Sequence, residues 1–115
     1  MSEADSKIKK LAAYINKNPG DSFSKFALAL EFKKMDRYNK ARILFENIRT
    51  NDPGYVGVYY HLGKIYELLD LDGQAAVTYR EGIRIASSNK GNERTVSDLE
   101  EALEELERSM ESGNK

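Results

Sequence analysis

A chain of 115 residues is long enough for one domain with a modest core, and with 40% hydrophobic and 32% charged side chains it does not have the composition of a disordered protein. It contains no cysteine, which excludes disulfides, thiolate metal ligands and a cysteine nucleophile. The formal net charge of −1 gives no reason to expect affinity for nucleic acid or for a membrane surface.

The N-terminal residues Met1–Asp5 are polar and acidic, and no apolar run in the chain reaches membrane-spanning length. We therefore expect neither a signal peptide nor a membrane span, and we expect a cytoplasmic protein. Charge is uneven, because residues 1–57 carry 11 Lys and Arg against 7 Asp and Glu, whereas residues 58–115 carry 7 against 12. The resulting charges of +4 and −5 either orient a charged partner or favour head-to-tail contacts, or they reflect only a lopsided solvated surface.

An amphipathic helix is predicted over residues 3–17. Its apolar face carries Ile8, Leu11, Ala12 and Ile15 at helical spacing. Leu11 lies 34 residues before Phe45, and 34 residues is the period that repeats along the chain. The segment therefore resembles the second helix of an incomplete preceding repeat, and we expect it to cap the N-terminal side.

The chain matches itself at an offset of 34 residues, with large apolar residues over large ones and small residues over small ones. The matched pairs are Asn18/Asp52, Pro19/Pro53, Gly20/Gly54, Leu28/Leu62, Ala29/Gly63, Phe32/Tyr66, Ala41/Ala75 and Phe45/Tyr79. This period is the length of a helix–turn–helix solenoid unit. We therefore predict one repeat over residues 22–55 and a second over residues 56–89.

Each repeat is predicted to hold two amphipathic helices separated by a short turn. Met35-Asp36-Arg37 is the expected turn of the first repeat, with Asp36 as N-cap of the following helix, and Asp70–Gly73 is that of the second. Gly63 and Gly82 fall within the predicted helices, where each costs about 1 kcal/mol relative to alanine. Such glycines indicate that two helices approach closely.

A last helix is predicted over residues 95–111, after a polar loop at Ser87–Arg94. Thr95 and Asp98 give it a start that resembles a capping box. Its apolar stripe holds Leu99, Ala102, Leu103, Leu106 and Met110, and glutamates fill its other faces. We expect it to act as a solvating helix on the C-terminal side. The alternative is a detachable helix that offers its stripe to a second copy or another partner.

The paired pattern resembles the tetratricopeptide repeat family. The first copy supplies Leu28-Ala29, Phe32, Ala41, Phe45, Ile48 and Pro53, and the second supplies Tyr59, Leu62-Gly63, Tyr66, Ala75, Tyr79 and Gly82. The departures are Lys25 and Ile48 in the first copy and Ser87, where the family has a proline, in the second. The resemblance implies an all-α fold, a short right-handed helical-hairpin solenoid of about six helices forming a single domain over residues 1–115.

The resemblance also implies a concave surface lined by the first helix of each repeat. Its partner-binding residues would be Phe23, Phe26, Leu30 and Lys33 from the first copy, and Tyr60, Lys64 and Glu67 from the second, with His61 nearby. The first-copy helix carries two apolar stripes, so it contacts something on both sides. Either the C-terminal helix fills this groove, or the groove is open to a short apolar peptide with a carboxylate. The lysine and asparagine clamp that some relatives use for chaperone C-termini is absent, since the matching positions hold Phe26, Leu30 and His61.

We therefore expect a non-catalytic protein-interaction module that binds a protein or peptide partner, with no metal and no cofactor. The alternative is a structural homodimer built through the repeat faces or the C-terminal helix. His61 is the only histidine and has no neighbouring nucleophile in the sequence, which disfavours an enzyme. A basic cluster from Lys33 to Arg42 is a weak indication of RNA contact, and the acidic run Glu100–Glu107 lacks the loop of a calcium site.

Overall fold

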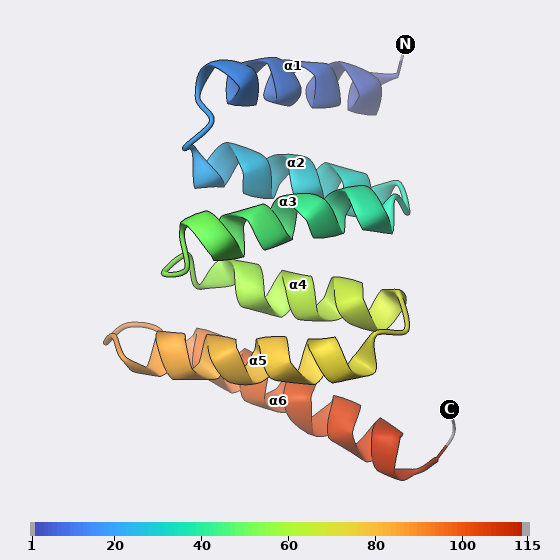
Figure 1. The fold of residues 1–115 in the computed structure, drawn as a ribbon, viewed down its shortest axis with the longest axis vertical. Coiled ribbons are helices and arrows are strands. Elements are labelled where there is room, and N and C mark those ends of the chain that lie inside the picture. Colours follow the sequence, from blue (N-terminus) through green and yellow to red (C-terminus); the bar gives the residue numbers. More distant parts are fainter. Residues whose placement is uncertain (1, 114–115) are drawn as a thin grey trace. The chain divides into compact units, whose positions relative to one another are not determined.

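The computed structural model describes residues 2–113 and folds them into helices with no strand among them (Figure 1). The helices are α1 (Glu3–Lys17), α2 (Ser22–Lys34), α3 (Tyr38–Asn51), α4 (Gly57–Leu68), α5 (Asp72–Ser87) and α6 (Glu93–Glu111). Their contacts group them into two compact units, α1 to α3 in the part that ends at Tyr55 and α4 to α6 in the part that begins at Val56. None of the helices in the described part is both long and apolar enough to span a membrane.

In the first unit, α1 begins at a side-chain cap and packs against α2. The Ser2 hydroxyl accepts a hydrogen bond from the Asp5 backbone N–H at 3.1 Å, which satisfies one of the unpaired donors of the first turn. At the other end the Asn18 side chain donates to the Tyr14 carbonyl at 2.9 Å. No residue of α1 is fully buried, so its apolar face is only partly covered.

Helices α2 and α3 form an antiparallel hairpin whose core is the one that the repeat pattern predicts (Figure 1). The buried apolar residues are Leu28 and Ala29 on α2, and Ala41, Phe45 and Ile48 on α3. Near the ends of the hairpin, the Ser22 hydroxyl donates to the Asp52 carboxylate at 2.7 Å. This bond ties the start of α2 to the end of α3.

The turns within both hairpins share one backbone geometry, and it corrects the prediction that Asp36 caps α3. Asp36 and Asp70 have φ angles of 59° and 61°, in the left-handed region. The Arg37 N–H bonds the Phe32 carbonyl at 2.9 Å, and the Leu71 N–H bonds the Tyr66 carbonyl at 2.8 Å. This is the Schellman motif, which closes the preceding helix. The N-cap of α3 is Arg37, without a side-chain cap, because Asp36 is used to end α2.

In the second unit, α4 and α5 pack closely at the two glycines that the sequence singled out. A Cβ atom on Gly63 would lie 2.1 Å from the Tyr79 ring, and one on Gly82 would lie 2.5 Å from the Tyr59 Cβ. Real Cβ atoms do not come so near, so a side chain at either position would force the helices apart. The prediction of close helix packing at these glycines is confirmed.

Helix α6 packs against α5 and, less extensively, against α4. It begins at Glu93 with Asn92 at its N-cap, before the expected start at Thr95, so the predicted Thr95 capping box is wrong. The chain has already turned into the helix when it reaches Thr95. Leu99, Ala102 and Leu106 are buried as the apolar stripe predicts, and Arg80 on α5 forms an ion pair with Glu107 at the edge of the contact.

Candidate functional site

The predicted partner-binding residues of the first repeat form one stripe along α2. Phe23, Phe26, Leu30 and Lys33 are spaced by three, four and three residues, which places them on a common face of the helix. Phe23, in the first turn, is 68% exposed and has the most exposed large apolar side chain of the described residues. The others are half-buried. The stripe therefore offers solvent an aromatic ring at one end and a lysine at the other.

Phe26 packs against two aromatic rings of its own unit. Its ring meets Phe45 edge-on, with centroids 5.7 Å apart and planes inclined by 61°, and it lies 5.4 Å from the tilted ring of Tyr55. Such edge-to-face contacts add to the energy of simple burial. The sequence-based prediction did not include Tyr55 among the residues of the site, although it lies at the end of the predicted first repeat. Phe26 is therefore a half-buried ring in contact with two aromatic neighbours.

The predicted residues of the second repeat form a polar and aromatic cluster on α4. The Lys64 Nζ lies over the Tyr60 ring, 5.5 Å from its centroid, and 3.9 Å from the Glu67 carboxylate. His61 meets the Tyr60 ring edge-on, with centroids 5.5 Å apart. All four side chains are half-buried. A cation placed over an aromatic face beside a carboxylate is an arrangement suited to peptide backbone and charged side chains.

Glu67 has a structural bond that the sequence did not reveal. The Tyr79 hydroxyl on α5 donates a hydrogen bond to its carboxylate. Burial, followed by this bond and the charge of Glu67, raises the pKa of Tyr79 far above that of a free tyrosine. Glu67 therefore holds α4 to α5, and one side of its carboxylate is already occupied.

The contacts of the α2 stripe and the buried face of α6 each lie within their own unit. Phe23 is largely exposed, and the rings that pack on Phe26 belong to α3 and to Tyr55. The buried residues of α6 instead lie against its own unit, since Leu99 approaches the backbone of Gly82.

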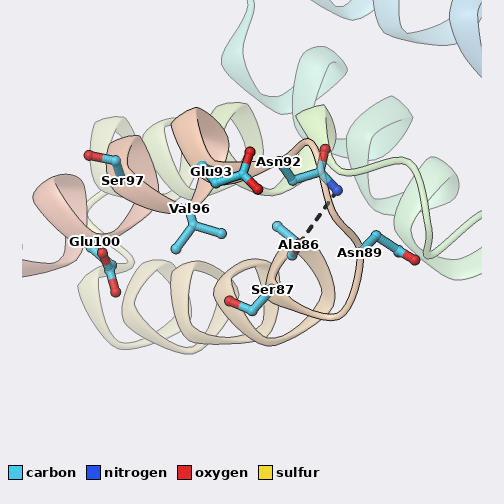
Figure 2. Close-up of a pocket in the computed structure, with 8 residues that line it drawn as sticks. All are labelled: Ala86, Ser87, Asn89, Asn92, Glu93, Val96, Ser97 and Glu100. Atoms are coloured by element: carbon cyan, nitrogen blue, oxygen red, sulfur yellow. Dashed lines mark hydrogen bonds between the residues drawn. The ribbon is translucent and has the colours of Figure 1, made fainter.

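A separate polar pocket of about 300 Å³ lies between the end of α5 and the start of α6 (Figure 2). Val96 points into it, with Ala86 opposite and Glu93 and Glu100 along the α6 side. The Asn92 side chain donates to the Ala86 carbonyl at 3.4 Å, and the Glu93 carboxylate accepts the Gly91 N–H at 3.2 Å. Backbone hydrogen bonds lower the pKa of Glu93. These groups close the loop between the helices, which explains the pocket's polar lining.

No group of three or more His, Cys, Asp or Glu side chains that could hold a metal ion occurs among residues 2–113. The described acidic residues of α6 are spread along the helix, where Glu104 pairs with Arg108 and Glu107 with Arg80. The α2 stripe and the α4 cluster are therefore the candidate partner-binding surfaces among the described residues.

Solved structures of helical-repeat proteins resemble this chain. A tetratricopeptide repeat domain protein from Salinibacter ruber is 44% identical over 76% of this chain and 96% of its own, with a TM-score of 0.72 in the crystal. Its solution structure gives a TM-score of 0.73. The chain belongs to the tetratricopeptide repeat family. Neither the protein-family models nor the curated proteins give a match to it.

More distant tetratricopeptide-type structures share the fold at low identity. PcrH, solved in complex with the chaperone-binding region of PopD, has a TM-score of 0.87 at 14% identity, over 94% of this chain and 81% of its own. SycD, a type III secretion translocator chaperone of Yersinia enterocolitica, has a TM-score of 0.87 at 13% identity, over 95% and 75%. The all-α repeat fold that the sequence predicted is thereby confirmed.

Proposed function

We propose that the chain is a non-catalytic interaction module that binds a protein or peptide through the exposed faces of α2 and α4. The observation that carries this proposal is Phe23, an aromatic ring 68% exposed to solvent at the head of a stripe of apolar side chains. Aromatic residues dominate the binding energy of many interfaces, so this ring is the anchor that we expect a partner to cover.

The α4 face supplies complementary chemistry. Tyr60, His61 and Lys64 present a ring, an imidazole and an ammonium group within one and a half helical turns. A peptide with apolar side chains and a carboxylate would bury an apolar group on Phe23 with its charge near Lys33 on α2, or an apolar group on Tyr60 with its charge near Lys64 on α4. The family is consistent with this role, and PcrH carries a bound segment of another protein.

The test is a peptide selection against the intact chain, with a displayed library of short random peptides as probe. The selected peptides are then titrated against wild type, Phe23→Ala, Tyr60→Ala and Ile43→Ala. Ile43 is the matched control, because it is an exposed apolar residue on α3 outside the two stripes. We expect Phe23→Ala and Tyr60→Ala to weaken binding by more than about tenfold and Ile43→Ala to change it little. Equal affinity of all four proteins would contradict the proposal.

Self-association through α6 has less support than partner binding. Three residues of the stripe that would form such an interface, Leu99, Ala102 and Leu106, are buried in the chain's own second unit, whereas Leu103 is half-buried and Met110 is exposed. Light scattering over a concentration series gives the readout. A monomer at every concentration supports a free binding face, whereas a stable dimer that Leu103→Glu disrupts would favour the homodimer.

A further inference from the structure

A second apolar surface lies in the first unit, between α1 and the face of α2 that adjoins the α2 stripe. It is a groove of about 400 Å³, lined by Lys7, Lys10, Leu11, Tyr14, Ser24 and Ala27. Tyr14 is 50% exposed, and Leu11 is half-buried. The described helices therefore leave this face of α1 open, although its centre is apolar.

The 34-residue period identifies what normally lies on this face. The four α1 positions of the groove correspond to positions 41, 44, 45 and 48 on α3 and to positions 75, 78, 79 and 82 on α5. On α5 these residues are Ala75, Thr78, Tyr79 and Gly82, and all of them are buried. The element that covers them is a helix, because Gly63 and Tyr59 of α4 lie directly on Tyr79 and Gly82. The same face of α3 is covered by α2, since Phe26 packs on Phe45.

We propose that the groove between α1 and α2 binds an amphipathic helix of a protein partner, with acidic residues on the flank that faces Lys7 and Lys10. The partner helix would take on α1 the place that α4 takes on α5. This surface is distinct from the exposed α2 and α4 faces, so the proposal does not depend on the function proposed above.

The positive charge of the groove indicates that the partner helix carries acidic residues beside its apolar face. Lys7 and Lys10 stand where α5 carries the buried Ala75 and Thr78, so a helix that lay there would meet two ammonium groups. Lys7 and Lys34 both lie 3.2 Å from the carboxylate of Glu31, which is only 8% exposed. Two lysines paired with one buried glutamate, together with Lys10 on the groove, leave positive charge at the rim of an apolar floor. Such a rim favours carboxylates and disfavours lysine or arginine.

None of the described helices is a fitting occupant of this groove. If two copies met through this face, Lys7 and Lys10 of each would stand against the same lysines of the other, which is repulsive. Helix α6 is acidic, but its apolar residues Leu99, Ala102 and Leu106 are already buried in its own unit. Apart from Met110 and the half-buried Val96 and Leu103, α6 offers mainly glutamate to solvent, so it lacks a continuous apolar stripe to fill the groove.

Two synthetic helical peptides test the proposal with the intact chain. Both carry the same leucine and alanine stripe, and their flanks carry glutamate in one and lysine in the other. Binding is measured by fluorescence anisotropy at low salt, where charge selectivity is greatest. We expect the glutamate peptide to bind wild type at least about tenfold more tightly than the lysine peptide.

Adjacent lysines provide a matched pair of variants. Lys10→Glu and Lys9→Glu change the net charge equally, and both residues are exposed, but only Lys10 lines the groove. We expect Lys10→Glu to abolish or reverse the preference for the glutamate peptide and Lys9→Glu to keep it. Amide NMR with the glutamate peptide should shift Leu11, Tyr14, Ser24 and Ala27.

Four results would overturn the proposal. They are binding of neither peptide by wild type, equal effects of Lys9→Glu and Lys10→Glu, and amide shifts centred on Tyr60 rather than Leu11. The fourth is a peptide-free dimer that Lys10→Glu dissociates, because a second copy would then be the occupant. Thermal unfolding of each variant confirms that a loss of binding does not come from unfolding.

Discussion

The backbone of Gly82 lies so close to Tyr59 that a Cβ atom at position 82 would stand 2.5 Å from the Cβ of the tyrosine. The same atom would be 3.0 Å from a methyl group of Leu99. Helices α4 and α6 thus both meet α5 at this glycine. A Cβ atom is the least mobile part of a side chain, so the contact cannot relax by rotation of a side chain.

We therefore expect Gly82→Ala to destabilise the protein by about 1–3 kcal/mol, since overpacking outweighs the roughly 1 kcal/mol that alanine gains in a helix. The free energy of unfolding in urea measures the change. Gly73→Ala is the control, because nothing lies within 4 Å of a Cβ at that position in the first turn of α5. It should leave stability unchanged or raise it. Equal effects at the two glycines would show that the close approach at Gly82 is not limiting.

The left-handed turn residues give an opposite prediction. Asp70 has a φ of 61° and follows the C-terminal end of α4, where both a side chain and a negative charge are unfavourable. Asp70→Gly should therefore raise the free energy of unfolding by about 0.5–1 kcal/mol. Thermal and urea unfolding both report the change.

Asp98→Gly is the control for the turn, because Asp98 is an exposed residue in the interior of α6. There glycine should lower stability by a few tenths of a kcal/mol to about 1 kcal/mol. Asp36→Gly should behave like Asp70→Gly, reduced by the loss of the bond from the Tyr38 hydroxyl to Asp36 at 2.9 Å. Destabilisation by Asp70→Gly would mean that the aspartate has a role that its backbone angle does not reveal.

The helices and their core were accessible from the sequence because size class repeats at one offset. The matched pairs indicate which helix faces must pack. Examples are Ala29 with Gly63 and Phe45 with Tyr79, and all four residues are buried. The caps were less accessible. Aspartate serves equally at the start of a helix and in a left-handed turn, and only the backbone angle shows that Asp36 does the second.

The candidate site was predicted only in outline, because the spacing on α2 and α4 gives a face but not its contacts. That Phe26 rests on Tyr55, and that Glu67 accepts a bond from Tyr79, depends on where separate helices place their side chains. The groove at Leu11 was also within reach, since Leu11 aligns with the buried Phe45. That the groove is an open surface became clear only from the structure, in which no described helix covers Tyr14 and its side chain is 50% exposed.

Acid should loosen α1 through Glu31. Burial alone would raise the pKa of this carboxyl, but its hydrogen bonds to Lys34 and Lys7 and the charges of those lysines outweigh burial and lower it. A lowered folded-state pKa means that the ionised form stabilises the fold above the ordinary value of 4.5, and that this contribution is lost as the pH falls through the folded-state value. Protection of the α1 amides against hydrogen exchange should therefore fall below pH about 4.5.

Two variants isolate this effect. Glu31→Gln should lower the protection of α1 near neutral pH and remove most of its acid dependence. Glu101→Gln is an equal change of charge at an exposed position on α6. It should leave the protection of α1 and the acid dependence of that protection as they are in wild type. If the protection of α1 in Glu31→Gln still falls in acid, then carboxylates other than Glu31 cause the acid dependence.

Alkaline titration tests the bond between Tyr79 and Glu67. Burial and the bond to a carboxylate both favour the neutral phenol, so the folded-state pKa of Tyr79 lies above the ordinary value. The resulting stability is present below pH about 10 and is lost only as the pH rises through the folded-state value. Tyr79 should thus stay protonated near pH 11, above the ordinary tyrosine pKa of about 10.

In the native protein Tyr79→Phe should leave the tyrosinate absorbance near pH 11 unchanged, whereas in denaturant the substitution should remove the share of one of the seven tyrosines. Because the variant also loses a hydrogen bond, its stability should fall by about 0.5–1.5 kcal/mol. A drop in native tyrosinate absorbance in the variant would show that Tyr79 ionises in the folded state and that its hydroxyl is not held by Glu67.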